Sequence, residues 1–120
     1  MATTASIQSL LAALEIFRVV GGKEFPIQRL IVFLYVATHD GCPQSTLTKV
    51  TGMSEASISR CLDALGPTDR FGRPGARLIS RRQDQDDYKR WRLFLTPKGQ
   101  SIADLMTDRL NSSTEESNDE

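Results

Sequence analysis

The sequence is poor in the residues that most often carry catalysis or bind metals. Its 120 residues include one histidine, His39, and two cysteines, Cys42 and Cys61. Two cysteines are too few for a disulfide framework, and no histidine lies near them at a spacing typical of zinc sites. No glycine-rich phosphate-binding motif is present. We therefore expect a cytoplasmic, nucleoid-associated protein that is not an enzyme and holds no metal or other cofactor.

Long apolar runs are also missing. The longest spans residues 30–37, well short of the ~20 residues that cross a bilayer. Residues 1–10 contain no basic segment before an apolar stretch, so we expect neither a secretory signal nor a membrane partner. With 39% hydrophobic residues, a chain of this length fits one modest core. These features predict a single domain over residues 1–110.

The net charge is zero, but charges of opposite sign are concentrated in different segments. Residues 43–99 hold eleven basic and six acidic side chains, a net charge of about +5. Residues 100–120 hold six acidic side chains and one basic side chain, a net charge of about −5. The basic middle segment suits a polyanion such as nucleic acid. Residues 111–120 are polar and acidic, which predicts a disordered tail.

Hydrophobic periodicity predicts four helices in the first half of the chain. Apolar residues at helical spacing indicate helices over about 4–20 and 26–39. Pro43 is expected to open a short third helix that ends near residue 51. Ser54 is a good N-cap for a fourth helix over residues 55–65, because its hydroxyl can accept from a free amide of the first turn. The last two helices form a helix–turn–helix pattern.

Two short strands and a final helix follow. The stretches "RLISRR" (77–82) and "RWRLFLT" (90–96) predict two short strands around the polar connection "QDQDDYK", and Trp91, Leu93 and Leu95 show the alternation of a half-buried strand. Residues 66–77 are rich in glycine and proline and read as a loop. A helix is then expected over residues 97–110. The element order predicts a mainly α (α+β) fold.

The fourth predicted helix has an outward face of small residues. With Ile58 facing inward, helical geometry places Ala56 and Arg60 outward and Ser57 and Ser59 beside them. Exposed helix faces usually carry Lys, Glu and Gln, which form helices better than Ser does. A helix that enters the ~12 Å major groove must be slim, and its hydroxyls and Arg can bind bases or phosphates. The face therefore indicates DNA reading, and a merely solvated face is the alternative.

The predicted hairpin is strongly basic. Its cations include Arg81, Arg82, Lys89 and Arg90. A basic hairpin can lie along the DNA backbone or enter the minor groove. Cations at a hairpin also protect edge strands in proteins that bind no DNA. Beside a helix–turn–helix pattern, the DNA-binding interpretation is favoured.

Four stretches, "STLTKVTGMSEASISRCLDAL", "LISRR", "DQDDYK" and "LFLTPKG", resemble the MarR (multiple antibiotic resistance regulator) family of transcription factors. The likeness covers about residues 28–99 and implies a winged helix-turn-helix with a two-stranded β-wing and flanking dimerisation helices. It implies a homodimeric regulator, with helix 54–65 in the major groove and wing 78–95 on the backbone or minor groove of double-stranded DNA. The expected DNA-contacting residues are Gln44, Ser45, Ser54, Ala56, Ser57, Ser59, Arg60, Arg81, Arg82, Lys89 and Arg90.

The first and last predicted helices have larger apolar faces than a compact three-helix core can cover. We expect these faces to pair with a second copy of the chain. The expected dimerisation residues are Ile7, Leu10, Leu11, Leu14, Ile102, Leu105 and Met106. Two-fold symmetry would place two reading helices about one DNA turn (~34 Å) apart, on a pseudo-palindromic operator whose occupation represses a promoter.

Three features depart from the family's pattern. Tyr88 and Lys89 follow Asp87 where members usually carry two arginines, and Lys89 lacks the planar fork of a guanidinium. The terminal helices are shorter than usual. The connection formed by residues 66–77 is longer, and either it is a simple connector or its arginines bind further phosphates. These arginines are Arg70, Arg73 and Arg77.

Two other functions are compatible with the same fold. One is a sensor, in which oxidation of Cys42 or Cys61, or a small-molecule inducer of unspecified chemistry, changes the DNA affinity. Packing in the core is the more common role for such cysteines. The other is a winged-helix module of a phage or plasmid replication or assembly complex that acts through protein partners.

Overall fold

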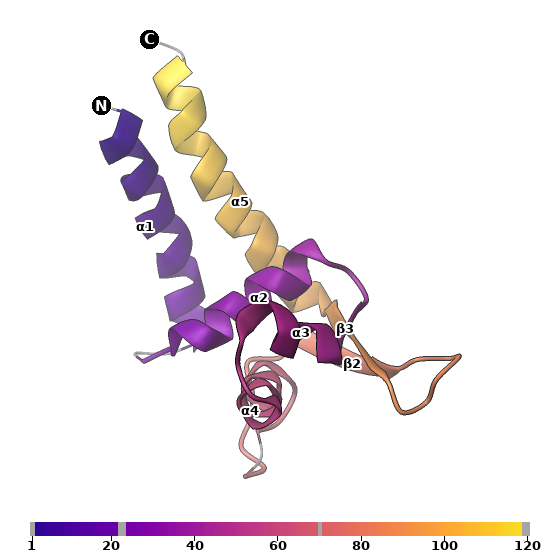
Figure 1. Ribbon diagram of the computed structural model, residues 1–120. Coiled ribbons are helices and arrows are strands. Elements are labelled where there is room, and N and C mark those ends of the chain that lie inside the picture. The colour runs from indigo at the N-terminus through magenta and orange to yellow at the C-terminus, as the bar shows by residue number, and fades with distance from the viewer. Residues whose placement is uncertain (1, 22–23, 70, 119–120) are drawn as a thin grey trace. The chain divides into compact units, whose positions relative to one another are not determined.

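The computed structural model describes residues 2–21, 24–69 and 71–118. The chain divides into two compact units, residues 26–100 and residues 1–25 with 101–120. The first unit contains α2 (Ile27–Thr38), β1 (Cys42–Pro43), α3 (Gln44–Thr51), α4 (Glu55–Leu65), β2 (Ile79–Gln83) and β3 (Trp91–Leu95) (Figure 1). The second contains α1 (Ala2–Gly21) and most of α5 (Pro97–Asn118). Because each unit is described by itself, the single domain expected over residues 1–110 stays a prediction.

The helix–turn–helix forms where the sequence predicted it. α3 ends at Gly52, whose φ of 73° lies in the left-handed region that glycine adopts without strain. The hydroxyl of Ser54 accepts a hydrogen bond from the N–H of Ser57 at 3.1 Å and so caps α4. α2 packs against α4 and β3. The fully buried side chains of this unit include Phe33, Leu47, Ile58, Leu62, Leu65, Leu78 and Leu93.

The sheet has three strands, whereas the sequence predicted two. β1 pairs antiparallel with β3, Cys42 opposite Leu93 and Pro43 opposite Arg92, which gives the order β1-β3-β2. A two-residue strand is too short to produce a visible alternation, so the pattern could not reveal it. Pro43 therefore precedes α3 as its N-cap and does not occupy its first turn.

Strand alternation gives the sheet an inner and an outer face. Arg81 lies opposite Leu93, which is fully buried, so both side chains point to the inner face. Arg82 lies opposite Arg92, one position along each strand, and points to the other face. The two adjacent arginines of β2 therefore have different neighbours.

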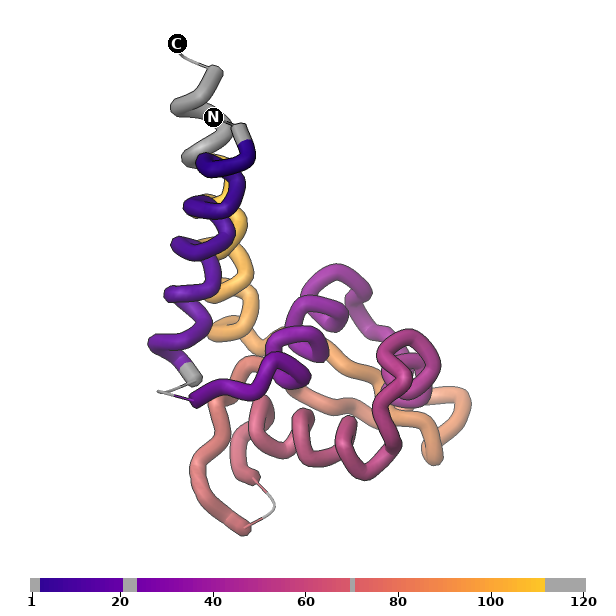
Figure 2. The backbone as a smooth tube through the Cα atoms, turned by 60° about the vertical axis from the view of Figure 1, so that its left-hand side comes forward, coloured from indigo at the N-terminus to yellow at the C-terminus, as the bar shows by residue number. Residues whose placement is uncertain are grey.

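α5 is longer than expected. It runs to Asn118 and so includes residues 111–118, which the sequence predicted as a disordered tail. No glycine or proline follows Gly99, so nothing in the backbone chemistry ends the helix at Leu110. Figures 1 and 2 both show α1 alongside the C-terminal part of α5, running in the opposite direction.

α1 has a buried and an exposed apolar side. Phe17 is buried, and its ring packs edge-on against Phe25 with 4.5 Å between the centroids. Three residues of the predicted dimerisation face are at least half exposed: Ile7, Leu10 and Leu11. Leu105 of α5 is 45% exposed, and Leu14 is half-buried. Ile102 and Met106 are buried within the single chain, and their expected role in a dimer stays a prediction.

The exposed side of α1 also bears on the question of membranes. Thr3–Val20 is long and apolar enough to cross a bilayer by length and composition, although the sequence predicted no such segment. The prediction rested on the length of uninterrupted apolar runs. Polar residues are dispersed through Thr3–Val20 and interrupt any such run in this helix. The core helix of a soluble protein and a signal sequence meet the same two criteria, so length and composition alone do not assign α1 to a membrane.

Gly99, in the stretch "LTPKG", allows α5 to start against the sheet. A Cβ at this position would lie 2.1 Å from the carbonyl oxygen of Leu78. We predict that Gly99→Ala lowers the free energy of unfolding by about 1–3 kcal/mol, because the backbone must shift to relieve the overlap. Ser101→Ala, at an exposed position of the same helix, is the control in urea denaturation. Equal stability of the two variants would contradict this prediction.

Candidate nucleic-acid interface

α4 presents a small, polar face outward. Ile58 and Leu62 are 1% exposed, so the inner stripe is where helical periodicity placed it. Ala56 and Arg60 are exposed on the other side. The Nε of Arg60 donates to the carbonyl oxygen of Ala56 at 3.4 Å, which directs the guanidinium toward the N-terminal turn. The outward face of α4 thus combines the methyl group of Ala56 with the guanidinium of Arg60.

The serines of α4 have different surroundings. The hydroxyl of Ser54 serves as the helix cap and also donates to the Ser57 hydroxyl at 3.1 Å. Ser57 and Ser59 are half-buried at the flanks of the outward face. Ser54 is thus engaged in capping, and Ser59 lines a cavity next to α3.

A cavity of about 470 Å³ opens between α3, α4 and the loop of the hairpin. It brings together five of the predicted contact residues, which come from three separate elements. These are Gln44, Ser45, Ser59, Lys89 and Arg90. The Gln44 Oε1 atom is buried and has no hydrogen-bond partner in the described structure, so it offers an unused acceptor at the cavity wall.

Trp91 also lines this cavity, and the sequence analysis did not include it in the candidate site. Its alternation with Leu93 predicted a half-buried position, yet Trp91 is 41% exposed while Leu93 is fully buried. Trp91 points to the inner face at the end of β3, beyond the core. The signal in the sequence was its position immediately after the basic loop residues.

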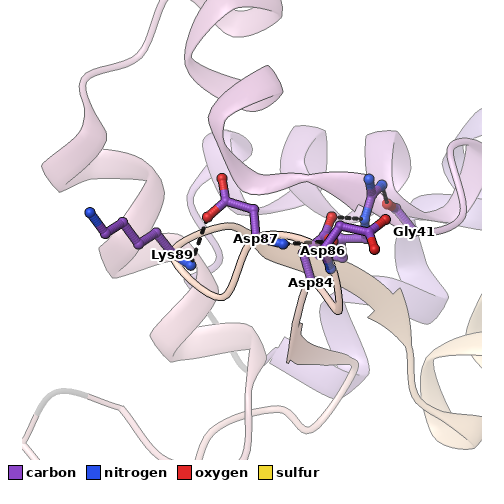
Figure 3. A network of polar contacts seen from close by, with 6 residues as sticks. Gly41, Asp84, Asp86, Asp87 and Lys89 are labelled. Atoms are coloured by element: carbon purple, nitrogen blue, oxygen red, sulfur yellow. Dashed lines mark hydrogen bonds and ion pairs between the residues drawn. The ribbon is translucent and has the colours of Figure 1, made fainter.

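The loop of the hairpin is organised around one carboxylate, Asp84. Asp84 is 8% exposed, and its Oδ1 accepts hydrogen bonds from the backbone N–H groups of Asp86 and Asp87 at 2.8 and 3.3 Å (Figure 3). Its Oδ2 accepts from the Nε of Arg92 at 2.7 Å. The hydrogen bond from the backbone N–H of Asp86 makes the largest contribution to lowering the pKa of the Asp84 carboxyl below its ordinary value. The hydrogen bond from the Arg92 side chain makes the second largest.

Arg92 connects this loop to the rest of the unit. Its Nη1 donates to the carbonyl oxygen of Gly41 at 2.9 Å, in the turn between α2 and α3 (Figure 3). The Asp84–Arg92–Gly41 contacts therefore tie the wing to the start of the helix–turn–helix. Such a tether holds the wing loop at a defined place beside α4.

The four predicted contact cations of the hairpin fall into two groups. Lys89 and Arg90 are exposed and line the cavity beside α4. Arg81 instead forms an ion pair with Asp63 of α4, with 3.0 Å between Nη2 and Oδ1. Arg82 points to the outer face, where its guanidinium carbon lies 4.7 Å from the ring centroid of Phe94.

These contacts give Arg81 and Arg82 partners within the chain, and their predicted contacts with DNA stay a prediction. A guanidinium paired with Asp63 positions α4 on the sheet, and one stacked on Phe94 faces away from α4. Both were predicted to contact DNA from the positive charge of the hairpin. Charge alone does not tell which face of the strand each residue occupies.

Neither cysteine is placed for reactivity. Cys42 and Cys61 are buried free thiols, and desolvation raises the pKa of each above its ordinary value. A raised pKa leaves little thiolate, the form that reacts with oxidants. Within the described ranges, no group of three or more His, Cys, Asp or Glu residues is placed to hold a metal ion.

No protein-family model and no curated protein matches the sequence of this chain. Its fold, in contrast, matches solved structures. RV1404 from Mycobacterium tuberculosis aligns over 99% of this chain and 75% of its own, with a TM-score of 0.74 and 18% identity. A MepR variant from S. aureus, bound to an oligodeoxyribonucleotide, aligns over 95% and 73%, with a TM-score of 0.67 and 16% identity. MarR aligns over 85% and 72%, with a TM-score of 0.60 and 21% identity.

The Asp84 tether predicts a pH-dependent wing. Because the pKa of Asp84 is lower in the folded than in the unfolded protein, its stabilisation is present above the unfolded pKa of about 3.9. It is lost as the pH falls through the folded pKa. Asp84→Asn should therefore destabilise the protein at neutral pH, and its difference from wild type should shrink below about pH 4.

Urea denaturation between pH 3 and pH 7 measures this difference, and hydrogen exchange at the N–H groups of Asp86 and Asp87 reports the wing itself. Faster exchange at both amides is expected in Asp84→Asn. Asp86→Asn changes an exposed carboxylate of the same loop and is the matched control. A constant difference across the whole pH range would show that the Asp84 charge does not stabilise the fold.

Proposed function

We propose that this chain, which has the winged-helix fold of MarR-type structures, is a sequence-specific, double-stranded DNA-binding transcriptional regulator. In this proposal it is a cytoplasmic homodimer that represses by occupying a pseudo-palindromic operator. Helix 54–65 enters the major groove, and wing 78–95 contacts the backbone or the minor groove. The observation that carries the proposal is the small outward face of α4 next to two exposed wing cations.

The shape and chemistry of α4 support a place in the major groove. Its outward side carries Ala56 near the N-terminus and Arg60 one turn later, so the helix is slim where it would approach the bases. A guanidinium can donate two hydrogen bonds to guanine O6 and N7, and a methyl group can contact the methyl of thymine. Ser57 and Ser59 add hydroxyls, which bind either bases or phosphates.

The wing supplies charge rather than sequence discrimination. Lys89 and Arg90 lie at the cavity beside α4, where a phosphodiester backbone along the edge of the groove would pass. Lys89 offers a point charge that suits contact with the backbone, whereas Arg90 beside it carries a planar guanidinium that could enter the minor groove. Ser45 and Gln44, at the N-terminus of α3, face the same cavity and add polar contacts to a phosphate.

The exposed side of α1 supports a dimer. Ile7, Leu10 and Leu11 are each at least half exposed on one helix, a concentration of apolar surface that soluble proteins usually cover with a partner. A second copy of the chain is the partner proposed here, since two reading helices related by two-fold symmetry bind a pseudo-palindrome.

Arg60 provides the direct test of the reading helix. We predict that Arg60→Ala lowers the affinity for an operator, recovered by in vitro selection, by about 5- to 150-fold for each half-site, the range for one bidentate base contact. Affinity for unrelated DNA should fall much less, because non-specific binding depends on phosphates. Fluorescence anisotropy with both DNAs measures the two values.

Arg18→Ala removes an exposed guanidinium of α1, paired with Glu15, and is the matched control for loss of one positive charge. If Arg60→Ala and Arg18→Ala bind operator and unrelated DNA equally well, α4 is not the reading helix. If the wild-type protein selects no DNA at all, the proposed function is wrong.

Introducing negative charges on the exposed apolar side of α1 tests whether this side forms the dimer interface. Leu10→Glu with Leu11→Glu should convert the protein to a monomer of 13.4 kDa, because two carboxylates cannot be buried in an apolar interface. Light scattering measures the mass, and operator affinity should fall with it. Gln8→Glu places a carboxylate at an exposed polar position of the same helix and should remain dimeric. A wild-type monomer, or a wild-type protein that partitions into lipid vesicles, would contradict the dimer.

A further inference from the structure

Residues 66–77 are called the arm, and its described residues, 66–69 and 71–77, fold back on themselves at the C-terminal end of α4 through an antiparallel bridge between Thr68 and Pro74. The N–H of Ala76 donates to the carbonyl oxygen of Ala64 at 2.9 Å, and the N–H of Leu78 donates to that of Leu65 at 2.7 Å. These bonds satisfy carbonyl groups that the last turn of a helix leaves free. The returning half of the arm is thus fastened to the end of α4, which a simple connector would not require.

Close backbone packing further fixes the base of the arm. A Cβ on Gly75 would lie 2.1 Å from the carbonyl oxygen of Gly66, so only glycine allows the two halves to approach this closely. Arg77 adopts a φ of 59°, a strained conformation for a residue with a side chain. Its carbonyl oxygen accepts a hydrogen bond from the Thr96 hydroxyl at 2.6 Å, while its side chain is exposed.

The tip of the arm holds a guanidinium in a defined orientation. Asp69 accepts hydrogen bonds at 2.9 Å from the N–H groups of Phe71 and Arg73, and at 2.7 Å from the Nε of Arg73. The guanidinium carbon of Arg73 lies 5.0 Å from the ring centroid of Phe71, which is 71% exposed. Because Asp69 takes the Nε proton, the two terminal nitrogens of Arg73 still carry donors for another anion. Arg70, the remaining arginine of the arm, lies outside the described residues.

The arm and the wing lie at opposite ends of α4. The wing loop shares a cavity with Glu55 and Ser59 in the N-terminal half of α4, whereas the arm begins directly after Leu65. Figures 1 and 2 both show the arm extending past α4 on the side away from α2. An α-helix of 11 residues is about 16 Å long, which exceeds the ~12 Å width of the major groove. A helix of this length in the groove therefore brings its C-terminal end to a phosphate backbone.

We propose that the arm is a second DNA-binding element, in which Arg73 and Arg77 bind backbone phosphates beyond the C-terminal end of α4. This inference rests on the proposed function, since it requires α4 to lie in the major groove. The arm then grips the strand opposite to the one that the wing contacts, so α4 is held from both ends.

The chemistry of the arm favours DNA over a protein partner. Its two described guanidinium groups are exposed, and Asp69, its one acidic residue, is turned inward to the backbone of the tip. A guanidinium whose orientation is already set by Asp69 and the Phe71 ring loses less conformational entropy when it binds a phosphate. Continuity with α4 places these groups next to the proposed interface and not on a separate surface.

The salt dependence of DNA binding tests the arm. Each phosphate contact contributes about 0.9 to the slope of log K against log salt concentration. In the proposed homodimer, the double variant Arg73→Ala/Arg77→Ala removes two such contacts from each protomer, so it should lower the slope by about 3.6 for operator DNA. The variant Arg73→Lys/Arg77→Lys keeps both charges and should keep the slope, and Arg18→Ala is the control for one lost surface charge. Circular dichroism establishes that each variant is folded.

Phosphate ethylation interference locates the contacts. In the wild type we expect interference at phosphates on both sides of each half-site, and the double alanine variant should lose one side only. If the double alanine variant keeps the wild-type slope and interference pattern while Arg60→Ala still binds operator weakly, the arm does not bind phosphates. The proposed function would then remain intact. Such a result, together with an exposed Phe71, would point to a protein partner for the tip. No selective binding by the wild type would overturn both.

Discussion

The burial of one stripe of α4 is the constraint on which the candidate interface depends. Ile58, Leu62 and Leu65 are at most 1% exposed, and burial of each contributes about 1.5–3 kcal/mol relative to an exposed side chain. Rotating α4 to expose this stripe would forfeit most of that energy. The side of α4 that faces outward is therefore determined by the core, which fixes the orientation of the small residues on that side.

A second constraint places the wing beside that face. A two-stranded hairpin is marginally stable in isolation, so its loop needs contacts outside the hairpin. Asp84 and Arg92 provide them, because the carboxylate organises the loop amides and the guanidinium reaches the carbonyl oxygen of Gly41. Pairing of β1 with β3 adds to this attachment at the same point of the chain. The wing and the turn between α2 and α3 are therefore joined by side-chain and backbone contacts.

The parts that the sequence predicted are those governed by periodicity and by local caps. The bounds of α4, its inner stripe and its Ser54 cap follow from spacing and from one hydroxyl near three free amides. The third strand was missed because two residues carry no alternation. Arg81 contacts Asp63 and Arg82 contacts Phe94 because they lie on opposite faces of β2. The net charge of the hairpin does not reveal on which face each arginine lies. Arg92 contacts Asp84, eight positions away, and Gly41, 51 positions away. No local sequence pattern extends over the second distance, so the sequence could not predict this tether.

The distribution of arginine around α4 links the two elements at its ends. The wing tip carries Tyr88 and Lys89 in place of two arginines, and a lysine binds a phosphate without the directional fork of a guanidinium. The arm at the opposite end presents Arg73 and Arg77 on a backbone that is fastened to α4 by its own carbonyl groups. The C-terminal end of α4 thus has two described guanidinium groups beside it, and the N-terminal end has one lysine and one guanidinium, Lys89 and Arg90. If both ends of α4 are held on DNA as proposed, the arm, which is fastened to α4 by backbone hydrogen bonds, would set the register of the helix along the groove.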